Sequence, residues 1–382
     1  MQYISTRNSN YKKTFYEVVM EGLPVDGGLY IPDKWPILNT ADLKNLNYSD
    51  LAYEIIYPYC GKSIEQEDLR LILRKTYKNF HHPQTAPLFK LEENKYILEL
   101  FYGPTFAFKD YALQFLGNLF DYFTRLETKK LTVLGATSGD TGSAAIEAFK
   151  AKKNINIFIL HPYEKVSDVQ RLQMTTVLES NVHNLAIKGN FDDCQKILKQ
   201  LFINSDLLSK TKISSVNSIN WARIIAQTVY YYWSYFQIDN DANKKVNFIV
   251  PSGNFGNVYA ARVAAKMGLP INKLHIATNS NDILHRIISK GLMNLEEVKK
   301  TLSPSMDIQV SSNFERQLFE SLDYHSEKLC LIMKSFIQEG NYKIDQKVLN
   351  KLQEIYETYS VNDKKILETI DLYSKKYKYI PD

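Results

Sequence analysis

A repeated order of strand, small-residue loop and helix constrains this chain most strongly. From about residue 91 onwards, short β-prone runs mostly alternate with helical patterns, which is typical of βαβ units and a parallel sheet. These runs are Leu131–Leu134, Ile155–Leu160, Val182–Ile187, Val246–Val250 and Leu274–Thr278. Two of them lead directly into loops that together hold five of the chain's 15 glycines. The sequence therefore predicts an α/β fold with two special loops between strand and helix.

The first loop is Leu134-Gly-Ala-Thr-Ser-Gly-Asp-Thr-Gly-Ser143, and an Ala-rich helical pattern at Ser143–Lys150 follows it. Glycines permit unusual backbone angles, and hydroxyls and backbone N–H groups converge where the helix dipole is positive. A carboxylate or a phosphate is the expected occupant. The loop is neither a Walker A motif nor G-x-G-x-x-G. Taken alone, an ordinary βα turn with a good N-cap explains it equally well.

The second loop is Pro251-Ser-Gly-Asn-Phe-Gly-Asn257, which opens a helical pattern at Val258–Met267 that Gly268 ends. Its backbone amides can hold a phosphate without a metal ion. A tight turn with no ligand is the alternative. Two such loops in one chain indicate a site for a ligand with two anionic parts.

Lys109 lies in Gly103-Pro-Thr-Phe-Ala-Phe-Lys-Asp-Tyr-Ala112, at the start of a helical pattern. Phe106, Phe108 and Tyr111 are close to it in sequence, and such crowding is expected to desolvate the ammonium and lower its pKa from about 10.4. A lysine in that state can form a Schiff base. The alternative is a solvated lysine at a helix start. A Schiff-base lysine and a metal-free phosphate loop together match the needs of pyridoxal 5'-phosphate, an aldehyde with a dianionic tail.

Composition excludes several other classes of protein. The chain has 382 residues, of which 45% are hydrophobic and 23% charged, and its formal net charge is +5. That length corresponds to about two or three domains with ample core, so a mainly disordered chain is excluded. The positive charge comes mostly from lysines spread through the chain, whereas nucleic-acid binding predicts a basic face with interleaved aromatics. We expect no nucleic-acid partner.

The cysteines and the N-terminal residues point to the cytoplasm. Cys60, Cys194 and Cys330 are far apart, with no C-x-x-C and no Cys/His group, so neither a disulfide framework nor a zinc site is expected. His81 and His82 lack further ligand spacing, which speaks against a metal. The first residues lack the apolar core of a signal peptide, and no stretch approaches the ~20 apolar residues of a membrane span. We expect no membrane association.

Five segments of this sequence resemble threonine synthases of the type found in enterobacteria and fungi. They are Gly-Pro-Thr-Phe-Ala-Phe-Lys-Asp, Ala-Thr-Ser-Gly-Asp-Thr-Gly, Ser-Val-Asn-Ser-Ile-Asn-Trp-Ala-Arg-Ile, Pro-Ser-Gly-Asn-Phe-Gly-Asn and Met-Asp-Ile-Gln-Val-Ser-Ser-Asn-Phe-Glu-Arg. The resemblance runs from Tyr3 to the last residue, with the segments in the family's order. It implies a tryptophan-synthase-β-like α/β fold with two parallel-sheet domains. The expected divisions are a helical N-terminal domain at 1–95, an α/β domain at 96–236 and a cofactor-phosphate α/β domain at 237–382.

The resemblance also implies roles for individual residues. Lys109 resembles the Schiff-base lysine, and Asp140 resembles a residue beside the ring hydroxyl. The implied cofactor site consists of Lys109, Asp140, Ser252, Gly253, Asn254, Phe255, Gly256 and Asn257. The implied substrate site consists of Thr137, Ser138, Gly139 and Thr141 at the carboxylate, with Asn217 and Arg223 at the phosphate. For Asn313 and Arg316, a role in the site and a role as a helix cap are both open, and the structural role is favoured slightly.

The activity implied is conversion of O-phospho-L-homoserine and water to L-threonine and phosphate, by a cytoplasmic monomer or homodimer. A related pyridoxal-phosphate lyase that releases 2-oxobutyrate, and an inactive truncated remnant, are the alternatives. The last residues, Tyr377 to Asp382, are expected to provide neither a helix stop nor a packed ending, and the last domain is expected to be incomplete at the C-terminus. The resemblance places the partner of the pyridine nitrogen beyond this point, so that partner is unassigned.

Overall fold

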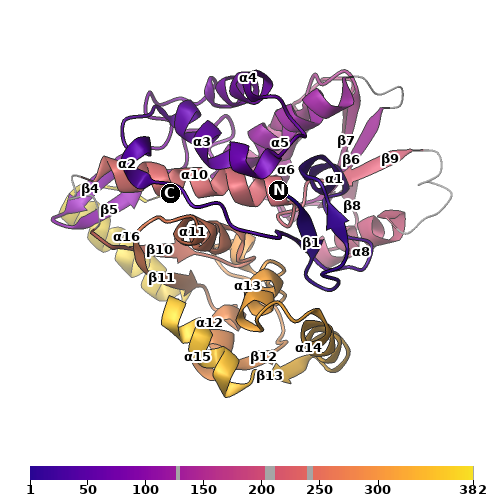
Figure 1. The fold of residues 1–382 in the computed structure, drawn as a ribbon. Coiled ribbons are helices and arrows are strands. Elements are labelled where there is room, and N and C mark those ends of the chain that lie inside the picture. The colour runs from indigo at the N-terminus through magenta and orange to yellow at the C-terminus, as the bar shows by residue number, and fades with distance from the viewer. Residues whose placement is uncertain (126–129, 203–210, 239–243, 382) are drawn as a thin grey trace.

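Two parallel sheets organise the molecule. The computed structural model describes residues 1–125, 130–202, 211–238 and 244–381. The first sheet has the strand order β8-β7-β6-β9 and the second has the order β10-β11-β14, and every strand pair in both is parallel. Figure 1 shows the first sheet in the upper lobe and the second in the lower lobe, with α10 running between them.

The first sheet follows the βα alternation that the sequence predicts. Its strands are β6 (Leu131–Ala136), β7 (Ile155–Pro162), β8 (Val182–Ile187) and β9 (Lys212–Ser215). The helices that accompany them are α5 (Lys109–Thr124), α6 (Asp140–Phe149), α7 (Asp168–Thr175), α8 (Phe191–Phe202) and α10 (Trp221–Gln237). Buried isoleucines and leucines of β6 and β7 form the centre of this lobe. Both loops with site residues from this lobe, 137–142 and 216–220, follow the carboxyl ends of neighbouring strands β6 and β9.

The second sheet contains one strand that the sequence pattern does not indicate. Its strands are β10 (Val246–Pro251), β11 (Ile271–Thr278) and β14 (Tyr356–Ser360). The remaining elements of this lobe are α11 (Gly256–Lys266), α12 (Ile283–Lys290), β12 (Leu292–Asn294), a 3-10 turn at Pro304–Met306, α13 (Phe314–Ser321), α14 (Ser326–Glu339), β13 (Asn341–Lys343) and α15 (Gln346–Ile355). Strands β13 and β14 lie in the stretch after Asp307, whose sequence pattern is otherwise helical and Lys-rich.

The N-terminal part contains strands as well as helices. Its elements are β1 (Tyr3–Ser5), β2 (Lys12–Lys13), α1 (Phe15–Glu21), β3 (Tyr30–Pro32), α2 (Thr40–Leu43), α3 (Tyr48–Cys60), α4 (Gln66–Tyr77), β4 (Leu88–Glu92) and β5 (Lys95–Leu98). Strands β2, β1 and β3 form a small antiparallel sheet, and β4 and β5 form a hairpin. The helices dominate this part, as the sequence indicates, because α3 and α4 carry most of its buried apolar side chains.

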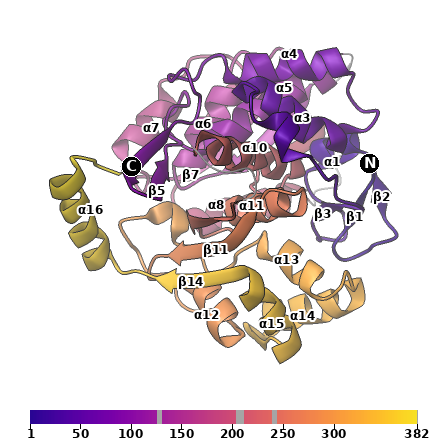
Figure 2. The same cartoon turned by 60° about the vertical axis from the view of Figure 1, so that its left-hand side comes forward.

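The end of the chain differs from the sequence-based expectation. Helix α16 (Asp363–Tyr377) stops at Lys378, which has a left-handed backbone conformation, and Tyr379 is buried with its ring stacked on Phe89 at 4.5 Å. Figure 2 shows α16 reaching away from the second lobe and the chain returning to β5. A helix stop and a packed contact are therefore both present. No helix in the described ranges combines the length and apolar character needed to cross a bilayer.

Candidate active site

Lys109 is the first residue of α5, and the preceding turn is fixed by its neighbour Asp110. The Asp110 carboxylate accepts hydrogen bonds from the Thr105 backbone N–H and hydroxyl, both at 2.8 Å. A Cβ at Gly103 would lie only 2.4 Å from the Asp110 Cβ, so this approach requires glycine. The glycine and aspartate of the segment around Lys109 thus shape the turn that presents the lysine.

The Lys109 ammonium pairs with the carboxylate of Asp140. Its Nζ lies 2.6 Å from Asp140 Oδ2, and the two side chains are 14% and 15% exposed. The Phe108 ring lies 5.2 Å from the same Nζ, but Phe106 is 61% exposed and does not enclose it. The expected crowding by three aromatic rings is therefore wrong for Phe106, and the closest partner of the lysine is a charge.

Asp140 is held in its charged form by several donors. Burial by itself raises the pKa of this carboxyl, but the charge and hydrogen bond of Lys109, the Ser305 hydroxyl and the Thr141 N–H together lower it below its ordinary value. Asp140 is also the first residue of α6, where the helix dipole favours a negative charge. Ser305 belongs to the second lobe, so the charge of this carboxylate is influenced from both lobes.

The loop before α6 is braced by Thr137. Its hydroxyl accepts hydrogen bonds from the N–H groups of Gly139 and Gly142, at 2.9 and 2.8 Å. Gly139 has φ 148°, and a Cβ there would meet the side-chain amide of Gln170 at 1.9 Å. The Thr137 hydroxyl is thus committed to the loop itself. Ser138 and Thr141 are half-buried in the same loop.

The loop between β10 and α11 turns sharply at Phe255. This residue has φ 61°, and its buried ring packs edge-on against Phe314 and Tyr356. Only the backbone of Phe255 is therefore available to a ligand. At the start of the loop, the buried Ser252 donates its N–H to the Ala277 carbonyl at 3.0 Å. The helix begins at Gly256, so Gly256 and Asn257 lie in its first turn.

Two asparagines of this loop are oriented by residues from α10 and from the preceding turn. Asn257 Oδ1 accepts hydrogen bonds from the hydroxyls of Tyr230 and Tyr231, at 2.5 and 2.7 Å. Asn254 Nδ2 donates to the Ser218 hydroxyl. The aromatic run of α10 is buried core, as its sequence indicates, but two of its hydroxyls also reach the site. Tyr230 and Tyr231 are not among the site residues predicted from the sequence. The available signal was a pair of tyrosine hydroxyls within an otherwise apolar helix.

Arg223 is a buried cation beside these loops. It lies in the first turn of α10 and is 2% exposed, with Nη1 donating to the Val216 carbonyl at 2.8 Å. Its Nε is buried and has no hydrogen-bond partner among the described residues. Burial lowers the pKa of Arg223 to about 10, and attraction by Asp140 opposes this shift. Asn217, in contrast, is exposed at the turn before α10.

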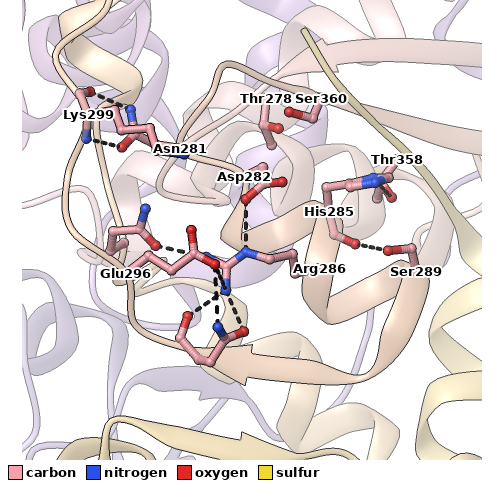
Figure 3. A network of polar contacts seen from close by, with 12 residues as sticks. Thr278, Asn281, Asp282, His285, Arg286, Ser289, Glu296, Lys299, Thr358 and Ser360 are labelled. Atoms are coloured by element: carbon pink, nitrogen blue, oxygen red, sulfur yellow. Dashed lines mark hydrogen bonds and ion pairs between the residues drawn. The ribbon is translucent and has the colours of Figure 1, made fainter. Parts of the chain in front are cut away.

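A segment of the second lobe, residues 299–311, lies against the Gly253 loop. A Cβ at Gly253 would be 3.1 Å from the Met306 Cα, and Gly253 O accepts from the Ser311 hydroxyl at 2.7 Å. The start of this segment is anchored by Asn281, which exchanges two hydrogen bonds of 2.8 Å with the backbone of Lys299 (Figure 3). Figure 3 also shows Arg286 bound to Asp282 nearby. The structure thus brings together Lys109, Asp140, the two glycine loops and the segment that carries Ser305.

Two protein-family models match this chain. The one described as "Threonine synthase N terminus" matches residues 2–77, and the one described as "Pyridoxal-phosphate dependent enzyme" matches residues 82–341. Among curated relatives, the threonine synthase of Pseudomonas aeruginosa is 43% identical over 373 residues, which covers 97% of this chain and 79% of the relative. The threonine synthase of Saccharomyces cerevisiae is 44% identical over 397 residues and covers 96% and 77%.

Solved structures agree with these relatives. The pyridoxal-phosphate-bound threonine synthase of Brucella melitensis superposes with a TM-score of 0.96 at 40% identity, covering 100% of this chain and 83% of the other. The yeast threonine synthase gives 0.93 at 40% identity, with 100% and 81% covered. The expected tryptophan-synthase-β-like α/β fold and the expected cofactor are thereby confirmed. The chain belongs to the threonine synthase family of pyridoxal-phosphate-dependent enzymes.

Proposed function

We propose that this chain converts O-phospho-L-homoserine and water to L-threonine and phosphate, at the site between Lys109 and the two glycine loops. The observation that carries the proposal is that Lys109, Asp140 and Arg223 place two positive groups and one negative group together. A lysine–carboxylate pair lies beside the buried Arg223, whose Nε has no hydrogen-bond partner in the described part of the chain. An unpaired buried donor is costly unless a ligand completes it, and a phosphate suits a guanidinium.

The residues present fit pyridoxal phosphate. The Lys109 amine would hold its aldehyde carbon covalently, and Asp140 would lie beside the ring hydroxyl. The amides from Gly253 to Asn257, at the N-terminus of the 11-residue helix α11, would hold its phosphate. Ser252 and Asn254 would support this loop through their own hydrogen bonds. When bound, the cofactor supplies an electron sink for negative charge that develops on the substrate carbons.

The substrate would be oriented at its two anionic ends. The carboxylate would bind to the loop of Ser138, Gly139 and Thr141, where backbone N–H groups and the start of α6 favour an anion. Thr137 would stabilise the loop rather than contact the carboxylate, because its hydroxyl already accepts hydrogen bonds from two N–H groups of that loop. Arg223 would bind the substrate phosphate, with Asn217 closing over it from the exposed turn.

Lys109 would move protons once its amine is free. Its Nζ would take the proton from the substrate Cα and exchange a proton at Cβ, and Asp140 would keep the amine aimed at these carbons through the 2.6 Å contact. Phosphate would leave the γ-carbon as the Cβ proton is lost, and a proton would then add at the γ-carbon to form the methyl group. Water would add its hydroxyl at the β-carbon while a proton returns to the α-carbon. Contact between Ser305 and Asp140 would keep the two lobes closed while these steps occur.

The test is a product assay with pure O-phospho-L-homoserine. Equal amounts of threonine and phosphate are expected from the wild type, and none from Lys109→Ala. Lys150→Ala is the control, because Lys150 pairs with Glu147 on the far end of α6. Phosphate accompanied by 2-oxobutyrate in place of threonine would assign the chain to the alternative lyase reaction. Phosphate release by Lys109→Ala at the wild-type rate would reject Lys109.

We further propose that this reaction takes place in the cytoplasm, without a nucleic-acid partner and in a monomer or homodimer. Three free cysteines, Cys60, Cys194 and Cys330, support a reducing compartment. Burial raises the pKa of the Cys60 thiol, which keeps it unreactive.

A further inference from the structure

The loop at 217–220, which follows β9, and the loop at 251–257, which follows β10, belong to different sheets but touch each other. Asn254 Nδ2 donates to the Ser218 hydroxyl across this junction. One loop is proposed above to serve the substrate phosphate, and the other to serve the cofactor phosphate. Their contact means that the position of one loop depends on the position of the other.

Asn313 strengthens the junction from the second lobe. Its side chain is fully buried, and its Nδ2 donates to the carbonyls of Asn254 at 3.1 Å and Ser218 at 3.4 Å. Its backbone N–H donates to the same Asn254 carbonyl at 3.2 Å. Asn313 precedes α13, but its side chain makes no capping hydrogen bond. The helix-cap role considered for this residue is therefore wrong, and its Nδ2 is used between the two loops.

Arg316 fixes the orientation of Asn313. Its Nη1 donates to Asn313 Oδ1 at 2.5 Å, which leaves the Asn313 Nδ2 facing the two loops. Its Nη2 donates to the Ile219 carbonyl at 2.6 Å, and its Nε donates to the Tyr30 carbonyl at 2.8 Å. The three donors thus contact the N-terminal sheet, the first lobe and the second lobe.

Burial of the Arg316 guanidinium has a free-energy cost. Arg316 is 0% exposed, and no carboxylate of the described residues lies within ion-pair distance of it. Glu315, the neighbour of Arg316 in sequence, forms its ion pair with Arg7 instead. A buried cation without a partner charge costs stability that an apolar residue would not cost. A function in the junction explains why a cation occupies this position.

We propose that Arg316 and Asn313 couple the two loops, so that an anion bound in the 217–223 region strengthens the hold of the 251–257 loop on the cofactor phosphate. The proposal rests on the proposed function of the two loops. Ordering either loop orders the shared contacts of Ser218, Asn254 and Asn313, and the second ligand then meets a junction already in place. Coupling of this kind is reciprocal and usually amounts to about 5- to 150-fold in affinity.

The experiment measures how fast the holoenzyme releases its cofactor. An excess of an unrelated apo-aminotransferase captures released pyridoxal phosphate, and the loss of bound-cofactor absorbance gives the rate. Saturating inorganic phosphate is compared with chloride at equal ionic strength. A dissociation rate is unaffected by phosphate that competes for the emptied cofactor loop. In the wild type, phosphate is expected to slow release by about 5- to 150-fold.

Arg316→Lys should still bind cofactor but lose this slowing, to within about 2-fold. Asn313→Ala should behave in the same way, and it decides the question if Arg316→Lys does not retain bound cofactor. Arg286→Lys is the matched control, since Arg286 is a buried arginine of the same lobe that pairs with Asp282 and Glu296 (Figure 3). Its other hydrogen bonds go to Asn294 and Gln309, and none goes to either loop. It should keep the full slowing.

Two results would overturn the proposal, and both are separable from the proposed function. Equal slowing in the wild type, Arg316→Lys and Asn313→Ala would show that phosphate acts without this bridge. Absence of slowing in the wild type would show that the loops are independent. In either case the threonine assay still reports on the reaction itself, because it does not depend on coupling.

Discussion

Asn257 shows how a single amide is oriented by residues far away in the sequence. Its Oδ1 accepts hydrogen bonds from both Tyr230 and Tyr231, which fixes the orientation of its amide in the first turn of α11. Burial raises the pKa of both tyrosines well above the ordinary value, so the hydroxyls remain protonated donors at neutral pH. An amide held by two donors loses little further freedom when it binds an anion.

Removing these hydroxyls should weaken cofactor binding. Tyr230→Phe and Tyr231→Phe each lose the hydroxyl that donates to Asn257 Oδ1. Loss of one such contact corresponds to roughly 2- to 12-fold weaker affinity for pyridoxal phosphate. Tyr232→Phe is the control on the same helix, because its hydroxyl bonds the Ala264 carbonyl at 3.4 Å, away from the loop. Fluorescence titration of the apoenzyme measures all three. Equal effects in the three variants would assign the tyrosines to the core alone.

Substitution of Arg223 should weaken substrate binding and leave cofactor binding unchanged. Arg223→Lys keeps a charge but loses the planar fork, and loss of one charge-assisted contact costs about 1.5–3 kcal/mol, or roughly 12- to 160-fold in KM for O-phospho-L-homoserine. The visible spectrum of bound cofactor should be unchanged. Steady-state kinetics and absorbance are measured on the same preparation. A variant that loses cofactor in parallel would place Arg223 in the cofactor site or in the core.

Helix α5 depends on the buried carboxyl at its start. Asp110 is 0% exposed, and burial raises its pKa from 3.8 to about 6, against the opposing hydrogen bonds of Thr105 and Ala107. Because the folded-state pKa is the higher one, the chain is favoured with Asp110 protonated. That contribution is complete below about pH 4 and is lost as the pH rises through about 6.

Asp110→Asn should remove this pH dependence. Relative to the wild type, the free energy of unfolding of the variant should rise by on the order of 2–4 kcal/mol between pH 4 and pH 7. Urea unfolding at several pH values measures the difference. Glu67→Gln, at an exposed carboxyl in α4, is the control and should run parallel to the wild type. A variant whose relative stability falls over this range would show that the Asp110 carboxylate is favoured in its charged form.

Elements with strong local patterns could be predicted from sequence, and those that depend on a partner could not. The run Ile155–Leu160 lies within β7, where Ile155, Ile157 and Ile159 are buried. The run Val182–Ile187 coincides with β8, whose residues are half-buried or exposed. Strand β14 has the sequence Tyr-Glu-Thr-Tyr-Ser, which becomes a strand only through parallel pairing with β11. Strands β1 to β3 have two or three residues each, too few for any period.

The same distinction holds for the site. The turn of Lys109 and the two glycine loops have local signatures, and the structure brings Lys109 and Asp140 into contact. Ser218, Asn313 and Tyr230 reach the loops from other elements, through hydroxyls and amides whose direction depends on the packed lobes. No spacing in the sequence encodes such directions. The assignment of individual site residues to cofactor and substrate stays a prediction.

At the scale of the whole molecule, α13 ties the second lobe to the N-terminal sheet. Glu315 Oε1 accepts from the Thr6 hydroxyl at 2.7 Å, and both of its oxygens accept from the Arg7 guanidinium. The side chains of Glu315 and Arg7 are 5% and 22% exposed. The neighbouring Arg316 bonds the Tyr30 carbonyl in β3. Segments about 300 residues apart in sequence are therefore joined by charged groups shielded from water.

This tie should contribute measurably to stability. Removal of Arg7 leaves the buried Glu315 carboxylate uncompensated, so Arg7→Ala should lower the free energy of unfolding by about 3–5 kcal/mol. Glu315→Ala should cost somewhat less, because the remaining Arg7 side chain is partly exposed and water can replace the carboxylate. In a double-mutant cycle, the two changes should be non-additive by about 0.5–3 kcal/mol.

Arg171→Ala is the control, since Arg171 and Asp168 form an exposed pair worth about 0–1 kcal/mol. Urea unfolding of the four variants gives these values. If Glu315→Ala costs no more than Arg171→Ala, the N-terminal sheet is held by its apolar contacts, and the charged tie only sets its register on α13.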